Sequence, residues 1–234
     1  MKRFLMTIAL MACVCVSMFS QNETETQNSE NGVVLIGGHQ YVDLGLPSGM
    51  LWATCNVGAN NPSEYGEYFA WAEVSEKDDY SVESYKWCKA SVHSQKKYCT
   101  NKVYGLVDNK STLDAADDAA TVNWGSECRM PSYNEVKELM EVCSWIWTSD
   151  YDNTGVAGYV VTGSNGNSIF IPASGYRCDG NTYLAGSYGY LWSSSLGSYS
   201  NCDAMVLNFK QNSVQWHGYG RHYGQPVRAV AKKI

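Results

Sequence analysis

The sequence predicts an α+β fold in which short antiparallel sheets dominate and two short helices are inserted. Short apolar runs are separated by turns rich in Gly, Asn and Ser, without the strand–helix alternation of parallel sheets. The chain has 234 residues, 44% hydrophobic and 17% charged, which suits one domain with a sizeable core. Its 17 Tyr and 8 Trp against 5 Phe indicate either half-exposed aromatic side chains or strands rich in aromatics.

The N-terminal segment predicts export of the protein. Residues 1–20 resemble a secretory signal peptide, since a basic start precedes an apolar run from Phe4 to Phe19 and Ser20 offers a small residue for cleavage. A competing interpretation is a lipoprotein anchored at Cys13, which would be the protein's only contact with a membrane. In both cases we expect a periplasmic, cell-surface or extracellular location.

A polar segment follows the signal peptide. Gln21–Asn31 contains no apolar residue, so residues 21–36 are expected to form a disordered tether before a domain at 37–234. The formal net charge is -6 and the 17 Lys and Arg are scattered. This distribution argues against nucleic acid as a partner, because a phosphate backbone requires a basic face.

The domain is expected to open with a β-hairpin. Its strands are Gly37–Gly45 and Met50–Cys55, around a turn that contains Pro47 and Gly49. The segment from Lys77 to Lys110 is long and weakly patterned, which indicates a functional loop or an insertion.

Two helices are expected in the middle of the chain. Leu113–Val122 is rich in Ala and favours a helix; its three acids resemble a metal cluster or, alternatively, the acidic start of a helix. Ser132 and Glu135 form a capping-box pattern before an apolar stripe, which predicts a helix to about Ser144.

The second half of the chain is predicted to form a series of strands. We expect strands at Trp145–Thr148, Tyr159–Thr162, Ser168–Ile171, Tyr183–Ser195 and Ala204–Trp216, the last of these turning at Gln211 and Asn212. The segment Asp150–Gly155 resembles the start of a calcium loop, but Val161 stands where the closing Glu belongs. A solvated turn is therefore expected.

The last quarter of the chain has the composition of a recognition surface. Tyr and Trp give large contact area for few rotatable bonds, and Ser, Gly and Asn adapt to a partner. A surface loop with incidental aromatics is the alternative. The predicted ligand-binding residues are Tyr199, Trp216, His217, Tyr219, Arg221, His222 and Tyr223.

Catalysis is not expected. The chain has 4 His, and His217 and His222 lack the spacing of a helical ligand pair. The run Ser193–Ser195 lacks the Gly-x-Ser-x-Gly elbow of a nucleophilic serine. We therefore predict a protein that is not an enzyme and that needs no cofactor.

Several motifs, in order along the chain, resemble one family. They are Tyr41–Gly49, Leu51–Gly58, Asp117–Ala120, Asn123–Gly125, Arg129–Pro131, Gly166–Ala173, Gly186–Tyr190, Trp192–Ser195 and Tyr223–Arg228. Together they resemble the Fibrobacter succinogenes major paralogous domain family, which is common among secreted and surface proteins of Bacteroidetes.

This resemblance implies a C-type lectin-like fold, related to formylglycine-generating enzymes and to the variable proteins of diversity-generating retroelements. It implies paired N- and C-terminal strands and a ligand surface on the C-terminal loops. The calcium-binding triplet of sugar-binding lectins is absent, because Gln225-Pro226-Val227 lacks its second polar ligand. Calcium-mediated sugar binding is therefore not expected.

Seven cysteines follow the signal peptide, and an exported chain favours disulfides. Cys88 and Cys99 lie within one loop, which favours their pairing. The resemblance adds Cys55–Cys143, which the family carries together, and Cys178–Cys202, which both depart from the family pattern. Cys128, which replaces the usual Trp of the family, is left unpaired.

Three functions follow as expectations. The first is a secreted or surface-attached module that binds a glycan or a protein ligand through the aromatic C-terminal loops. The second is a structural or adhesin subunit of a surface assembly, in which another chain covers the same loops. The third is an oxidase of the formylglycine-generating type, for which Cys178 and Cys202 do not match the expected reactive-cysteine motif.

Overall fold

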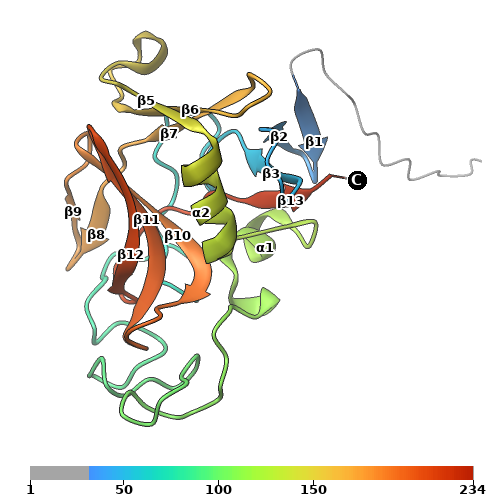
Figure 1. Ribbon diagram of the computed structural model, residues 1–234. Coiled ribbons are helices and arrows are strands. Elements are labelled where there is room, and N and C mark those ends of the chain that lie inside the picture. The colour runs from blue at the N-terminus through green and yellow to red at the C-terminus, as the bar shows by residue number, and fades with distance from the viewer. Residues whose placement is uncertain (1–31, 234) are drawn as a thin grey trace, which may run out of the picture.

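The computed structural model describes residues 32–233 (Figure 1). The predicted signal peptide, Cys13 and most of the predicted tether lie outside the described residues. Among the described residues, no helix combines the length and hydropathy that a membrane span requires. The elements are antiparallel strands with two short α-helices, as the sequence predicts.

The first sheet joins both ends of the described chain. Its order is β1 (Val33–Ile36), β2 (His39–Asp43), β3 (Met50–Ala53), β13 (Val230–Lys232) and β4 (Cys128–Arg129), with every neighbouring pair antiparallel. The expected first hairpin is therefore confirmed as β2 and β3. The C-terminal strand β13 lies beside β3, so N- and C-terminal strands pair (Figure 1).

The predicted tether extends four residues too far. Val33–Ile36 forms β1 and pairs with β2, and Val34 and Ile36 are buried. These residues are an apolar run, unlike the polar residues before them, and an apolar run next to a strand edge is stabilised by burial. The ordered domain therefore includes them.

The remaining strands form three further sheets. One holds β5 (Ser144–Thr148), β6 (Gly158–Thr162) and β7 (Ser168–Pro172); another holds β10 (Tyr188–Leu196), β11 (Asp203–Lys210) and β12 (Ser213–Gly220); the hairpin of β8 (Tyr176–Cys178) and β9 (Asn181–Tyr183) is the third. The predicted hairpins over residues 159–171 and 204–216 are confirmed. Strand β12, however, continues to Gly220, where the sequence indicated a loop.

Two helices are present, and one differs from its prediction. A 3₁₀ turn (Ala115–Asp117) and helix α1 (Ala119–Trp124) replace the single helix expected at Leu113–Val122. Asp118 separates them because its side chain accepts a hydrogen bond from the Thr121 amide at 2.9 Å, which makes it the N-cap of α1. The other acids also have structural partners: Asp114 and Asp117 bind Lys97.

Helix α2 (Tyr133–Val142) begins where its capping box predicts. The Ser132 hydroxyl accepts from the Glu135 amide at 3.3 Å, and the Glu135 carboxylate accepts from the Ser132 amide at 2.7 Å. Glu135 also binds the guanidinium of Arg129 through two hydrogen bonds of 2.6 and 2.8 Å. This network fixes the position of the first turn of α2. A second 3₁₀ turn (Tyr151–Asn153) lies between β5 and β6.

The sheet of β10, β11 and β12 separates two hydrophobic clusters. Alternate residues of a strand point to opposite faces, so Trp192 and Val206 pack in one cluster with Trp71. Leu207 and Phe209 pack in the other cluster, which includes the inner face of α2. Figure 1 shows α2 lying across this second face. Strands β10 and β11 are therefore covered on both sides, whereas β12 contains no buried residue.

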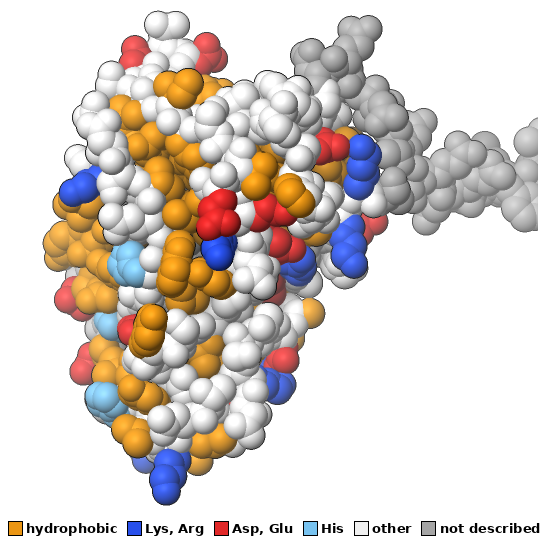
Figure 2. All heavy atoms as spheres, in the orientation of Figure 1, with side chains coloured by type: hydrophobic (Ala, Val, Ile, Leu, Met, Phe, Trp, Pro, Cys, Tyr) orange, Lys and Arg blue, Asp and Glu red, His pale blue; other side chains and the backbone are white. Residues whose placement is uncertain are grey.

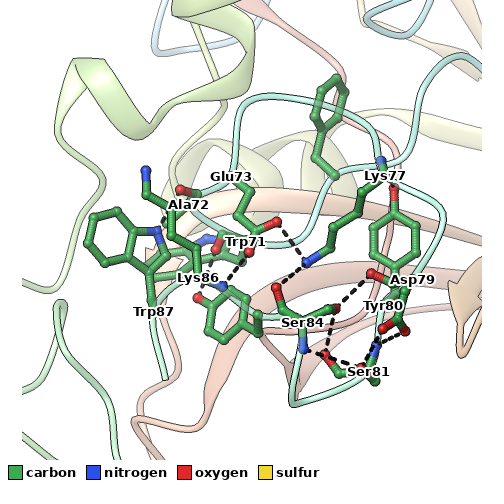
Figure 3. Close-up of polar contacts among 12 residues, drawn as sticks. Trp71, Ala72, Glu73, Lys77, Asp79, Tyr80, Ser81, Ser84, Lys86 and Trp87 are labelled. Atoms are coloured by element: carbon green, nitrogen blue, oxygen red, sulfur yellow. Dashed lines mark hydrogen bonds and ion pairs between the residues drawn. The ribbon is translucent and has the colours of Figure 1, made fainter. Parts of the chain in front are cut away.

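The long segment between residues 77 and 110 is a structured loop without helix or named strand. Its first part is tied by local polar contacts (Figure 3): Glu73 accepts from the Lys86 amide at 2.7 Å and binds Lys77, which also donates to the Ser84 carbonyl at 3.2 Å. The Trp87 indole donates to the Ala72 carbonyl at 2.8 Å. These contacts hold the loop on the core rather than leaving it free.

None of the three predicted disulfides is formed. All seven described cysteines are free thiols, because members of each predicted pair lie in different surroundings. The Cys88 thiol contacts the Val82 carbonyl at 3.1 Å, whereas that of Cys99 contacts the Asn101 carbonyl at 3.1 Å. The members of the other two predicted pairs also have different neighbours. Cys55 lies against Ala59, Cys143 packs in the α2 cluster, Cys178 belongs to β8 and Cys202 contacts the Val92 carbonyl.

Candidate functional site

A cleft with two lobes lies between the start of α2, the loop that joins β10 to β11, and strand β12. The large lobe has a volume of about 630 Å³ and the small lobe of about 370 Å³. Both are lined by Gly197, Ser198, Met205 and Trp216. Figure 2 shows that the surface beside the charged residues of α2 carries mostly hydrophobic and uncharged side chains. We call these two joined hollows the cleft.

The register of β11 and β12 shapes the floor of the cleft. Met205 lies opposite Gly218, and Leu207 lies opposite Trp216. Met205 is itself buried, and Gly218 opposite it adds no side chain to the space above the strands. A Cβ on Gly218 would lie 3.2 Å from the Cβ of Asp203. Glycine at this position therefore keeps the small lobe open beside Asp203.

Trp216 and Tyr133 form the aromatic wall. Their rings meet edge to face, with centroids 4.8 Å apart and planes at 73°. Tyr133 is the first residue of α2, and its amide donates to the Ser195 hydroxyl at 3.0 Å. Trp216 remains 37% exposed, and no described residue accepts a hydrogen bond from its indole. The wall therefore presents a fixed aromatic surface with a free polar group.

Asn201 and Asp203 provide the amide and the carboxylate of the cleft. The Asn201 side-chain oxygen accepts from the amides of Thr100 and Asn101 at 2.7 and 3.0 Å, so the position of this side chain is fixed. Asp203 lines the small lobe and forms no ion pair with a described residue. Burial raises the pKa of the Asp203 carboxyl above its usual value, against the lowering effects of Ser200 and His217.

The cleft is almost free of charge. Its other polar lining residues carry hydroxyl or amide groups: Thr100, Ser111, Thr112, Ser132, Asn134, Ser195, Ser198 and Ser200. Asp203 and His217 line the small lobe, and neither Lys nor Arg is among the described residues that line either lobe. This lining offers many hydrogen bonds to an uncharged ligand and no cation to an acidic one.

The seven predicted ligand-binding residues do not form one surface. Tyr199, Trp216 and His217 line the cleft, and Tyr199 is 92% exposed. Tyr219 and Tyr223 instead pack with Tyr176, with ring centroids 5.6 and 5.5 Å from it. Tyr219 lies on the face of β12 opposite to Trp216, because alternate residues of a strand point to opposite faces. The His217 ring lies on the face of Tyr219, with ring centroids 5.6 Å apart, although His217 also lines the small lobe.

His222 packs against Tyr223. Its ring lies 4.1 Å from that of Tyr223, and burial lowers its pKa. The tyrosines and His222 thus form an aromatic cluster around β8, and His217, at the edge of the small lobe, is in contact with it through Tyr219. The half-buried rings of the cluster cover one side of the sheet.

Arg221 is the clearest departure from the sequence prediction. It is 1% exposed and donates to the Tyr85 hydroxyl at 2.9 Å and to the carbonyls of Lys97, Tyr98 and Asn201 at 3.1 to 3.3 Å. Its guanidinium carbon also lies 4.8 Å from the Trp71 ring centroid. The prediction that Arg221 contacts a ligand at the surface is therefore wrong, and the residue ties the long loop to the sheet.

Sequence reasoning missed Tyr133, Asn201 and Asp203. The capping box located Tyr133 at the start of a helix, but no local pattern brings residue 133 to residue 216. Asn201 and Asp203 lie within the expected surface region and were not singled out, because their roles depend on contacts with Thr100 and Gly218. Long-range packing therefore determines where these three residues lie in the cleft.

The cleft does not contain an activated nucleophile. The Ser195 hydroxyl accepts from the Tyr133 amide, and no described base contacts it. The thiol of Cys202 lies 4.0 Å from His93 Nδ1, and burial raises the pKa of Cys202, which favours the unreactive thiol. No group of three His, Cys, Asp or Glu among the described residues could hold a metal ion.

Comparison with known proteins gave no match: no family model matches the chain, and no curated protein or solved structure matches it. The geometry of the cleft is therefore the basis for assigning a function.

Proposed function

We propose that this protein is an exported binding module of C-type lectin-like type, and not an enzyme, whose cleft recognises a glycan or a protein ligand. The observation that carries the proposal is the pair of Trp216 and Tyr133 in a cleft of about 630 Å³, within the usual size range of ligand pockets. An aromatic platform surrounded by hydroxyl and amide groups binds through stacking and hydrogen bonds. Paired terminal strands support the fold assignment.

The test is a screen of the purified protein on glycan and extracellular-protein arrays, followed by calorimetry. Trp216→Ala is expected to weaken binding of the strongest ligand at least about tenfold, because truncating an aromatic anchor removes much of the binding energy. Tyr183→Ala is the matched control, since Tyr183 is similarly exposed, at 41%, and lies on β9 rather than at the cleft. Equal affinities of Trp216→Ala and the parent protein, both folded, would place the site elsewhere.

A second candidate function is a subunit of a surface assembly. Strand β12 is eight residues long and lies at the end of its sheet, and no strand among residues 32–233 pairs with its outer edge. An unpaired edge of this length can accept a strand from another chain. Concentration-dependent oligomers in analytical ultracentrifugation that disappear on Val214→Pro would support this function over the first, because Val214 lies opposite Phe209 in a pair without ladder bonds and proline there removes an amide of the free edge.

A further inference from the structure

We propose that the ligand of the cleft is an uncharged glycan, and that Asn201 and Asp203 determine its specificity by hydrogen-bonding sugar hydroxyl groups beside Trp216. This inference rests on the proposed function, because it identifies the chemistry of the ligand for the same cleft. The inference adds the two residues that would form hydrogen bonds with the ligand and so determine its specificity.

The charge of the lining argues for an uncharged ligand. A sulfated, phosphorylated or sialylated ligand requires Lys or Arg for strong binding, and the described lining of both lobes contains neither. The single carboxylate, Asp203, would also repel an acidic group. Sugar hydroxyls, in contrast, can donate to this carboxylate without bringing a charge.

Asn201 has one polar atom left for a ligand. Its oxygen is occupied by the amides of Thr100 and Asn101, whereas its Nδ2 donates to no described residue. That nitrogen is also absent from the buried unsatisfied atoms of the described chain, so it reaches solvent although the residue is only 6% exposed. Since Asn201 lines the large lobe, we place this donor at the cleft.

Asn201 and Asp203 are complementary to a hydroxylated ring. A sugar hydroxyl accepts from an amide N–H and donates to a carboxylate, so two hydroxyls of one glycan can satisfy both side chains. Asn201 lines the large lobe and Asp203 the small lobe, and the lobes share Trp216. The two polar groups thus flank one aromatic platform, on which the apolar face of a pyranose can stack.

The lining fits a sugar better than a peptide side chain. A peptide anchor requires an apolar pocket for an aromatic or aliphatic residue, and the aliphatic lining is limited to Leu196 and Met205. The other lining groups are mainly hydroxyls and amides. In addition, the backbone contacts that hold Asn201 reduce the entropy lost when it binds.

Isosteric substitutions test the two residues separately. Asn201→Asp keeps the oxygen that accepts from Thr100 and Asn101 but replaces the Nδ2 donor by an acceptor. Asp203→Asn keeps the shape but removes the charge. Asp152→Asn is the control, because Asp152 is exposed in the turn before β6 and its φ of 51° suits Asn.

The probe is an array of neutral, aminated, sulfated and sialylated glycans, followed by calorimetry with the strongest neutral glycan. We expect binding to neutral glycans only, a loss of about tenfold or more in Asn201→Asp and in Asp203→Asn, and no change in Asp152→Asn. Affinity is expected to stay within about twofold between 0.05 and 0.5 M NaCl, since an uncharged ligand is insensitive to screening. The thermal midpoint of each variant shows whether it folds. If one of the two variants does not fold, the affinity of the other tests the inference.

The outcomes separate this inference from the proposed function. Preference for an acidic or aminated glycan, no binding to any neutral glycan, or unchanged affinity in the folded variants would overturn the inference. A peptide ligand lost on Trp216→Ala would overturn it while leaving the cleft as the binding site. A neutral glycan whose binding survives Trp216→Ala would overturn the proposed site itself.

Discussion

At position 221 a guanidinium group is enclosed by three carbonyls and the Tyr85 hydroxyl. We predict that Arg221→Met lowers the free energy of unfolding by about 3–5 kcal/mol, because it leaves these acceptors buried without their donor. Urea denaturation followed by circular dichroism measures the change. Tyr199→Ala is the control, expected within about 0.5 kcal/mol, since this side chain is 92% exposed. A change below about 1 kcal/mol in Arg221→Met would contradict the structural role.

The same residue shows why the seven predicted residues do not form one surface. In the sequence, Arg221 lies among glycines and aromatics, which favoured an exposed loop. Its partners Lys97 and Tyr98 come from the long loop, and no local pattern indicates that this loop folds over it. Contacts between Arg221 and a remote segment could not be derived from the sequence. Tyr199, Trp216 and His217, which were predicted from composition, line the cleft.

At the scale of elements, the position of the first turn of α2 sets the aromatic wall. We predict that Ser132→Ala lowers the free energy of unfolding by about 1 kcal/mol, because the Glu135 amide loses its side-chain acceptor. The same variant should weaken ligand binding, since Tyr133, next to the cap, contacts Trp216. Chemical denaturation and calorimetry measure the two effects.

Ser164→Ala is the control for this prediction. Ser164 is exposed in the turn between β6 and β7, so neither stability nor affinity should change. An unchanged midpoint in Ser132→Ala would show that the remaining bond, from the Ser132 amide to Glu135, suffices as a cap. A loss of stability without loss of affinity would separate the cap from the cleft.

Elements with strong local signals were predicted well. The capping box gave α2, and the Gln211–Asn212 turn gave the β11–β12 hairpin, where Asn212 has a φ of 65°. The end of β12 was missed because its glycines at 218 and 220 suggest a loop. In the structure, Gly218 lies opposite Met205 within the β11–β12 ladder. Only this pairing shows that the predicted residues on β12 point to opposite faces of the sheet.

At the scale of the whole molecule, antiparallel pairing was predictable but the assembly of the four sheets was not. Sheet order depends on contacts between distant segments, such as β13 between β3 and β4. The resemblance to lectin-like proteins indicated paired terminal strands, and this pairing is observed. The resemblance also implied disulfides, whereas the seven described cysteines are free thiols. Spacing along the chain does not determine which thiols come together.

The central place of β13 gives the last prediction. Deleting residues 229–234 removes the strand that pairs with both β3 and β4 and exposes the buried residues around Val230. We expect the truncated chain to lose its cooperative thermal transition, because the core loses apolar contacts and both neighbouring strands lose their ladder bonds. Circular dichroism during heating measures the transition.

Deleting only residues 233 and 234 is the matched control. This change removes one exposed ion pair, between Lys233 and Asp43 at 3.0 Å, which contributes about 0–1 kcal/mol. The shorter deletion should therefore melt within a few degrees of the parent chain. If the longer deletion also melted cooperatively near the same temperature, β13 would be dispensable. The pairing of the terminal strands would then not be required for the stability of the first sheet.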